Sequence, residues 1–376
     1  QGRRHHQTPA FSYIQTLPEW GVRERNPTVD GTMIMSIKRS TSIVSILGRI
    51  IKAAVIVFFL VLSTTYGWRP SFPSGSNAAI DQGLPKRLEN TVRVLSEEIG
   101  PRNYASYANL NKAADFIKST FQEIGYNPEE WAYEVDGRTY RNIVVGAKRN
   151  FTGEYIVVGA HYDSCFNPGA DDNASGIAGL LELARLLKRS DLKVPVMFVA
   201  FTNEEQPFFM TGQMGSLVFV RALKESSVKI KAAIILEMIG YYSRGLFSQK
   251  YLPLLGPFYP NKADFVAIVG NFASREVVDF IDNDFKRHKY FPARALSSPG
   301  FVPGINFSDH WSFWQEGYPA VMITDTAYLR NKNYHTMTDA AATLNYEKMA
   351  KVVLGLKEAV VRLSNNANLT AVRSER

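Results

Sequence analysis

From about residue 84 onward, the hydrophobic pattern of the chain alternates between helical and extended periods. Apolar residues recur at helical spacing over Leu84–Ile99 and Ala108–Ile124, and Asn173–Lys188 carries a broad apolar face. Short apolar runs rich in β-branched residues predict the strands Ile143–Ala147, Tyr155–Gly159, Val194–Phe201, Ile230–Leu236 and Tyr318–Ile323. Strands that alternate with helices predict an α/β fold, an open and mostly parallel mixed sheet with helices on both faces.

A stretch rich in proline, glycine and aromatic residues interrupts this alternation at 243–306. It contains one further predicted strand, Phe265–Val269, and one predicted helix, Glu276–Lys286. Long irregular segments in compact domains are usually functional, so we expect a cap-like insertion over the site. The main domain is expected to span 84–365, followed by a tail at 366–376.

The N-terminal part has a different character. Four basic residues precede the uncharged, largely apolar stretch Ala53–Trp68, and they are Lys38, Arg39, Arg49 and Lys52. This layout is typical of a secretory signal or signal-anchor. We interpret 35–69 as an uncleaved anchor that places the main domain outside the cytoplasm, periplasmic or extracellular. The alternative is a cleaved signal and secretion. Residues 1–34 are predicted to be disordered or an upstream extension, and 70–83 a linker.

Charge and cysteine content narrow the possible functions. The net charge is +8, but residues 1–69 hold nine basic and three acidic residues, which accounts for six of those charges. The main domain therefore lacks the basic surplus of a nucleic-acid-binding domain, and membrane contact is expected through the N-terminal helix alone. The single cysteine, Cys165, permits no intrachain disulfide. It follows His161 by four residues, and we interpret it as a bystander in the loop.

Histidine and acidic residues stand where predicted strands end or a helix begins. His161 ends the strand Tyr-Ile-Val-Val-Gly-Ala, and Asp163, two residues on, can accept the second N–H of its imidazole. Asp171 and Asp172 open the strong helix at Asn173. Two consecutive aspartates exceed what a helix cap needs, so one of them is expected to cap while the other faces a metal.

Further acids and a histidine follow later strands. Glu204 and Glu205 follow one apolar strand, Glu237 ends another, and His335 follows the last. Two imidazoles and several carboxylates, without a thiolate, suit a pair of divalent zinc-like ions. The pattern indicates a metal-dependent hydrolase. Ser308-Asp309-His310 is a further polar cluster that could orient substrate or a ligand, with Asp309 and His310 as candidate substrate-binding residues. Arg330 could bind a substrate carboxylate.

Five ordered motifs carry a family resemblance. They are Gly-Ala-His-Tyr-Asp-Ser, Pro-Gly-Ala-Asp-Asp-Asn-Ala-Ser-Gly, Asn-Glu-Glu, Ser-Asp-His and Tyr-His-Thr. Over about 84–363 the chain resembles the M28 zinc peptidases of the aminopeptidase Y type. The resemblance implies a phosphorylase/hydrolase-like fold and two Zn²⁺ per chain acting on peptide substrates. By position, His161 and Glu237 would bind one zinc, Glu205 and His335 the other, and Asp172 would bridge them.

The resemblance also implies roles for residues that bind no metal. Glu204 would be the general base, taking a proton from the attacking water and returning it to the leaving amine, with Asp163 as the partner of His161 and Asp171 as the companion of Asp172. Two positions depart from the pattern. Many relatives carry Asp at Glu237, and some carry a tyrosine at Ile305. Tyr334 resembles the tyrosine that stabilises the intermediate in the glutamate carboxypeptidase branch.

We therefore expect a zinc-dependent exopeptidase, an aminopeptidase, with three alternatives. Carboxypeptidase-like or dipeptidase activity could use the same site. A single-zinc glutaminyl cyclase would keep Asp172, Glu205 and His335 but would have no use for His161 as a ligand. A non-catalytic, membrane-anchored binding protein would be expected to have lost ligands or the base, whereas this chain keeps all of them.

Overall fold

An eight-stranded mixed sheet forms the centre of the computed structural model. Its strands follow the order β1-β2-β4-β3-β5-β8-β6-β7 across the sheet. Their bounds are β1 Glu129–Val135, β2 Arg138–Val145, β3 Glu154–His161, β4 Val196–Phe201, β5 Lys229–Glu237, β6 Val266–Asn271, β7 Ala293–Ser298 and β8 Ala320–Thr324. The four central strands β4, β3, β5 and β8 run parallel. Antiparallel pairing begins at β2 on one side and at β6 on the other.

The structure describes residues 81–148, 153–251, 256 and 259–367. The predictions for 1–34, 35–69 and most of the linker and tail therefore lie outside the described residues. Within the described ranges, no helix is both long enough and apolar enough to cross a membrane.

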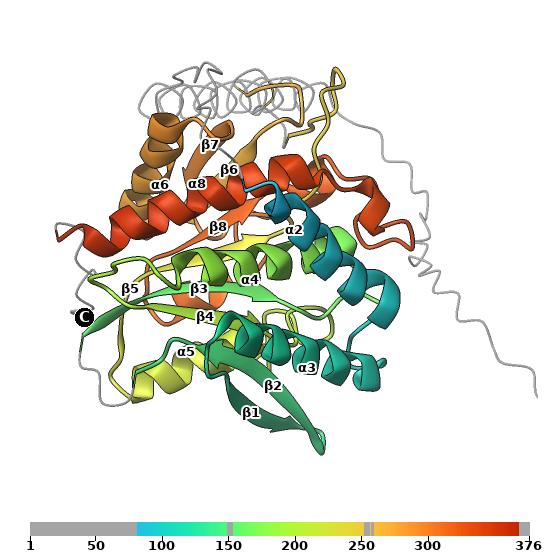
Figure 1. Ribbon diagram of the computed structural model, residues 1–376, viewed down its shortest axis with the longest axis vertical. Helices are drawn as coiled ribbons and strands as arrows, with labels where there is room; N and C mark the ends of the chain where they lie inside the picture. The colour runs from blue at the N-terminus through green and yellow to red at the C-terminus, as the bar shows by residue number, and fades with distance from the viewer. Residues whose placement is uncertain (1–80, 149–152, 252–255, 257–258, 368–376) are drawn as a thin grey trace, which may run out of the picture. The chain divides into compact units, whose positions relative to one another are not determined.

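Helices cover both faces of the sheet (Figure 1). Their bounds are α2 Gly83–Arg93, α3 Tyr107–Ile124, α4 Gly176–Leu187, α5 Gly215–Glu225, α6 Arg275–His288, α7 His310–Gln315 and α8 Tyr346–Asn365. Helices α2, α3, α4, α6 and α8 pack on one face, and α5 and α7 on the other. Gly125 ends α3 in the left-handed conformation, with φ of 93°, which glycine adopts without steric cost.

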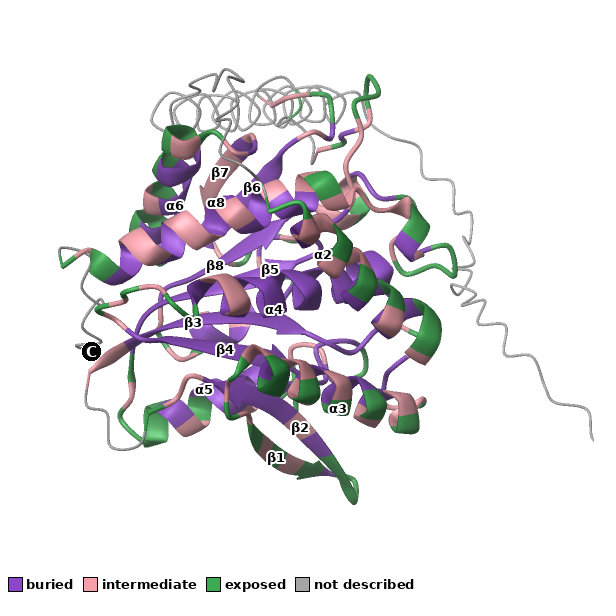
Figure 2. Ribbon diagram, viewed as in Figure 1, coloured by how far each residue is buried: buried purple, intermediate pink, exposed green. Residues whose placement is uncertain are grey.

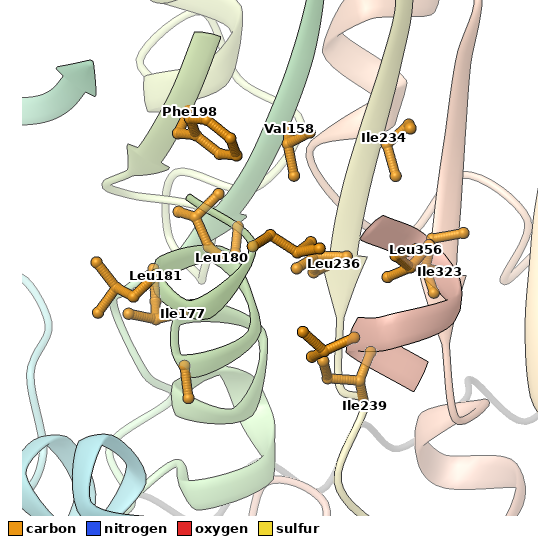
Figure 3. Packing of buried hydrophobic residues seen from close by; sticks show 14 of the residues in the cluster. Val158, Ile177, Leu180, Leu181, Phe198, Ile234, Leu236, Ile239, Ile323 and Leu356 are labelled. Carbon is orange, nitrogen blue, oxygen red and sulfur yellow. The ribbon is translucent and has the colours of Figure 1, made fainter. Parts of the chain in front are cut away.

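The central strands are buried on both faces because their side chains alternate between two cores. In β3, Ile156 and Val158 belong to the core beneath α4, whereas Tyr155 and Val157 belong to the core beneath α5 and α7. Figure 2 shows these strands buried along nearly their whole length, except at the first residues of β3 and β5. In Figure 3, Leu180 and its neighbours on α4 lie beneath the apolar side chains of the sheet. Both cores are completed only when helices cover both sides.

The predicted fold class is confirmed, and most predicted elements appear within a few residues of their expected bounds. The segment 243–306 differs from expectation. It supplies β6, α6 and β7, which complete one edge of the sheet. This part of the predicted cap is therefore an edge of the fold itself. β1 was not predicted because its residues are mostly exposed, and β7 because its side chains are only half-buried.

The packing of α4 gives a first prediction. Leu180 is fully buried, so Leu180→Ala removes apolar contacts and leaves a cavity, and the free energy of unfolding should fall by about 2–5 kcal/mol. The same substitution at Leu246, whose side chain is 69% exposed, should change it by less than ~0.5 kcal/mol. Urea unfolding of the two variants measures both. Equal losses would contradict the assignment of α4 to the core.

Candidate active site

The carboxyl ends of three parallel strands, β3, β4 and β5, lie at the same edge of the sheet. His161 is the last residue of β3, Glu237 is the last residue of β5, and Glu204 and Glu205 follow β4. Asp172 lies in the irregular turn Ala170–Ser175 before α4. Because the carboxyl ends of neighbouring parallel strands meet in one crevice, residues far apart in sequence come together there.

Asp172 lies between the two histidines. Its Oδ1 is 3.4 Å from Nε2 of His161, and its Oδ2 is 3.1 Å from Nε2 of His335, which the loop after β8 carries. Each oxygen of one carboxylate thus faces a different imidazole. This is the arrangement that lets a carboxylate bridge two ions, as in two-metal sites.

The other carboxylates divide between the two histidines. Glu237 Oε2 is 3.2 Å from Nε2 of His161, and Glu205 Oε2 is 3.5 Å from Nε2 of His335. Glu204 Oε2 lies 3.9 Å from Nε2 of His161. The structure therefore brings together all five predicted ligands and the predicted base, with all but His335 buried.

Asp163 connects the strand of His161 to the glutamate pair. Its two oxygens accept hydrogen bonds from the backbone N–H groups of Glu204, at 3.1 Å, and Glu205, at 2.9 Å. Its Oδ1 also lies 3.5 Å from Nδ1 of His161. The sequence predicts only the histidine contact. The structure adds a second task for this carboxylate, which is to fix the backbone that carries the base.

Ser308 contacts Glu237 directly. Its Oγ donates a 2.6 Å hydrogen bond to Oε2 of Glu237, so the predicted Ser-Asp-His cluster contains a residue that orients a ligand. Sequence analysis gave this role to no particular residue of the cluster. The signal was present in the motif, because a hydroxyl is the group that can donate to a ligating carboxylate.

Asp339, which no sequence pattern singles out, holds the turn that presents Asp172. Its carboxylate accepts hydrogen bonds from the backbone N–H groups of Asp171 and Asp172. The side chain of Asp171 faces elsewhere, because it accepts hydrogen bonds from Gly240 N–H and from the amide of Asn331. Of the two consecutive aspartates, Asp172 faces the histidines and Asp171 ties neighbouring loops together.

Arg102 fixes the loop between His161 and Asp172. Its fully buried guanidinium donates to the backbone carbonyls of Tyr162, at 2.6 Å, Pro168, at 2.6 Å, and Gly169, at 2.7 Å. Burial lowers the pKa of Arg102 to about 10, so the side chain remains a cation at neutral pH. Sequence analysis missed this residue, since one arginine after a Gly-Pro turn carries no distinctive pattern.

The remaining predicted site residues occupy varied positions. Tyr334 stacks on the ring of His335 at a centroid distance of 3.8 Å, and burial, with the carboxylates of the site, raises the pKa of its hydroxyl. Asp309 is fully buried and neither carboxylate oxygen has a hydrogen-bond partner among the described residues. His310 is buried, with Nε2 2.7 Å from the carbonyl of Ile305, and burial lowers its pKa to about 4.

Arg330 is held away from solvent by its own contacts. Its guanidinium donates to Gln249, Thr326 and the carbonyl of Phe265, and it lies over the ring of Phe265. Only 7% of the residue is exposed. A buried guanidinium engaged in this way supports the loops on which it lies, while its Nη2 has no hydrogen-bond partner among the described residues.

The electrostatics of the site require added positive charge. Burial raises the pKa values of Glu204, Glu205 and Glu237 above their usual range. The pKa of His161 is also raised; burial opposes that shift, and the nearby Glu237 and Glu204 outweigh it. Asp172 behaves differently. Burial opposes ionisation, but the nearby imidazoles of His161 and His335 lower the pKa of Asp172 below its usual range.

The residues fit divalent metal ions. The donor atoms form two groups, and within each group all of them lie within 4.8 Å of one another. One group is His161, Asp172 and Glu237, and the other is Cys165, Glu205 and His335. Both ring nitrogens of His161 and Oε1 of Glu205 are buried without a hydrogen-bond partner in the described chain. Buried polar atoms without partners are costly, and a cation satisfies them together with the carboxylates. Imidazole and carboxylate ligands suit zinc.

The fold and the site together define a metal-dependent hydrolase, and comparison with known proteins gives the family. The family model described as Peptidase family M28 matches residues 142–360. A relative from Escherichia coli strain K12, the uncharacterized protein YfbL, is 40% identical over 321 residues, which cover 82% of this chain and 97% of the relative. The chain belongs to peptidase family M28 and is a metallopeptidase.

More distant relatives include aminopeptidases. Leucine aminopeptidase 1 of Ajellomyces capsulatus strain H88 is 29% identical over 223 residues, which cover 54% of this chain and 52% of the relative. The chain thus spans about half the length of that fungal relative.

Solved structures share the fold at low identity. The LapA aminopeptidase of Legionella pneumophila has a TM-score of 0.62 at 21% identity, covering 80% of this chain and 78% of its own. BSAP, a zinc aminopeptidase from Bacillus subtilis, has a TM-score of 0.59 at 18% identity, with 74% and 94% covered. Fimbriiglobus ruber glutaminyl cyclase has a TM-score of 0.57 at 19% identity, with 79% and 99% covered.

The raised pKa values predict how the stability of the metal-free protein depends on pH. Folding raises the pKa values of three buried acids, which are Glu204, Glu205 and Asp309. The pKa of Asp309 in the folded protein is raised to about 7. Their protonated forms therefore favour the fold, and this contribution is lost as pH rises through the folded pKa values. His161 acts in the same direction, because its protonated form is favoured in the fold. The opposite contribution of Asp172 is confined to acid pH, below its usual pKa of 3.8.

The metal-free protein should therefore melt at a lower temperature at about pH 8 than at about pH 6. Zinc should remove most of this loss, because bound dications favour the ionised carboxylates. Differential scanning calorimetry with and without zinc measures both effects. A melting temperature of the metal-free protein that rises from pH 6 to pH 8 would contradict this account of the buried carboxylates.

The contacts of Arg102 give a second prediction for the site. Arg102→Lys keeps the charge but cannot reach three carbonyls from one ammonium, so the free energy of unfolding should fall by about 3 kcal/mol. Arg185→Lys, at a side chain that is 37% exposed, serves as the matched control and should change it by less than ~0.5 kcal/mol. Urea unfolding measures both variants. A value for Arg102→Lys as small as the control would show that the carbonyl contacts contribute nothing.

Proposed function

We propose that the protein is an aminopeptidase that uses two zinc ions and Glu204 as the general base. One observation carries the proposal: the two oxygens of Asp172 face two different histidines. His161 and Glu237 would hold one ion, Glu205 and His335 the other, with Asp172 shared. When bound, the ions supply Lewis-acid polarisation of the peptide carbonyl and lower the pKa of the attacking water.

Glu204 is placed to move the proton. Its carboxylate is near His161 yet is not among the two groups of clustered donor atoms, so it stays free to accept a proton from water. Its raised pKa suits a base that must take a proton and then return it to the leaving amine. Asp163 holds the backbone N–H of Glu204 and so fixes where the base stands.

Tyr334 is the proposed donor to the developing oxyanion. Its stacking on His335 places the ring beside the second donor group, and its raised pKa keeps the hydroxyl protonated at neutral pH. A neutral hydroxyl can donate a hydrogen bond where negative charge develops. Ile305, at the alternative position for such a tyrosine, is a buried core residue.

Glutaminyl cyclase activity is the second candidate, because solved cyclases share this fold. The position of His161 favours the peptidase. Its Nε2 lies within 3.4 Å of both Asp172 and Glu237, which completes a donor group that a single-zinc cyclase would not need. A carboxypeptidase would use the same donor groups. It differs from an aminopeptidase in removing residues from the C-terminus of the peptide instead of the N-terminus.

We also propose that the catalytic domain acts outside the cytoplasm, membrane-anchored through 35–69 or secreted after cleavage. The support is the basic and apolar pattern of that segment, which lies outside the described residues. Cell fractionation with N-terminal sequencing tests it. Recovery of the full-length chain in the cytoplasmic fraction would contradict it.

Replacing the base gives the sharpest mutational prediction. Glu204→Gln should lower kcat by at least ~10²–10⁴-fold while leaving bound zinc unchanged, because the amide cannot accept the proton of the attacking water. Glu98→Gln, at an exposed acid that belongs to neither donor group, is the matched control and should retain full activity. Steady-state kinetics and zinc content are measured on the same samples. Undiminished kcat in Glu204→Gln would remove this residue from the mechanism.

The proposed specificity is tested with free and N-blocked peptides before and after chelation. Cleavage of free N-termini only, lost on chelation and restored by two zinc ions per chain, is the expected result. Cleavage of N-blocked peptides from the C-terminus would show a carboxypeptidase instead. Cyclisation of N-terminal glutamine with one zinc ion per chain, and no hydrolysis, would establish the cyclase.

A further inference from the structure

Cys165 is the only cysteine of the chain, and it lies in the loop between His161 and Asp172. The residue before it fixes its position. Ser164 exchanges hydrogen bonds with the backbone N–H and carbonyl of Arg102, and its carbonyl accepts from the amide of Asn103. Its hydroxyl also donates to the carbonyl of Asn167. The loop on which the thiol stands is therefore held on both sides of Cys165.

The sulfur lies among donor atoms of the second metal group. Sγ of Cys165 and one donor atom each of Glu205 and His335 all lie within 4.8 Å of one another. Glu205 is 5% exposed, and its Oε1 has no hydrogen-bond partner in the part of the chain that the structure describes. An unpartnered buried carboxylate oxygen close to a thiol and an imidazole is the environment expected of a cation site.

The two donor groups then differ in one respect. The group of His161, Asp172 and Glu237 offers three protein ligands. The group of Glu205 and His335 shares Asp172, whose Oδ2 is 3.1 Å from His335, and has Cys165 in addition.

We propose that Cys165 binds the second zinc as a thiolate, together with Glu205, His335 and the shared Asp172. The proposal rests on the two-zinc site of the proposed function. On binding, the thiol loses its proton to solvent and the sulfur forms a bond to the ion, so no oxidant or reductant takes part. The thiolate adds a ligand to the second site, so the ion bound there is retained more firmly.

Cobalt substitution tests the assignment without reference to activity. Cobalt(II) bound to a thiolate gives an intense near-ultraviolet charge-transfer band, which carboxylate and imidazole ligands do not give. The wild-type chain loaded with two cobalt ions should show this band, and Cys165→Ser should lose it. The affinity of the second ion, measured by competition with a chelator, should fall by about 10–100-fold or more in Cys165→Ser.

Two further variants separate ligation from a disturbed loop. Cys165→Asp supplies an oxygen ligand at the same position, so it should recover much of the affinity without the charge-transfer band. Phe166→Ala changes the neighbouring residue, which is half exposed, and should keep both the band and the affinity. Loss of the band in Phe166→Ala with Cys165 intact would show that the loop, and not the sulfur, sets the spectrum, and would overturn the assignment.

Thiol reactivity gives an independent measurement, because the chain has no other cysteine. A disulfide reagent should modify Cys165 at least tenfold more slowly in the zinc-loaded protein than in the metal-free protein, if the ion holds the sulfur. Two bound cobalt ions without the band, or equal thiol reactivity with and without zinc, would overturn the role of Cys165 alone. A wild-type chain that binds no metal would overturn the proposed function as well.

Discussion

Negative charge buried at the carboxyl edge of the sheet is the constraint on which the site depends. Asp163, Asp172, Glu204, Glu205 and Glu237 are all less than a tenth exposed, and burial raises the pKa values of the three glutamates. An isolated buried carboxylate is tolerated only when it is protonated, paired or bound to a metal. Bound dications would neutralise much of this charge without adding protons, and would leave carboxylates that can ligate or accept a proton.

Side chains that bind no metal hold the ligand-bearing backbone in place. Asp163 accepts the N–H groups of Glu204 and Glu205, and Asp339 accepts those of Asp171 and Asp172. In both cases one carboxylate accepts hydrogen bonds from two consecutive backbone N–H groups. These bonds fix the backbone of the two residues and therefore the direction of their side chains. Preorganisation of this kind lets a hydrolase keep its charged groups in place before substrate arrives.

The sequence was sufficient for the fold class and for the residues that meet at the edge, since strand ends and buried apolar runs leave strong patterns. It was insufficient for Arg102 and Asp339, which act through backbone atoms that no side-chain pattern records. The sequence could not show that the candidate substrate-binding residue Arg330 is buried, because its contact with Phe265 depends on how distant loops meet. The part of 243–306 that joins the sheet could not be placed either, because strand order is set by tertiary packing.

The donor residues come from widely separated parts of the chain, with His161 and His335 at opposite ends of the set. No short peptide therefore contains a complete site, in contrast to zinc fingers, in which the metal itself drives folding. A complete donor set exists only where the ends of β3, β4 and β5 and the loop after β8 have come together. Metal affinity therefore depends on the assembled sheet, and loss of the sheet would remove the site as a whole.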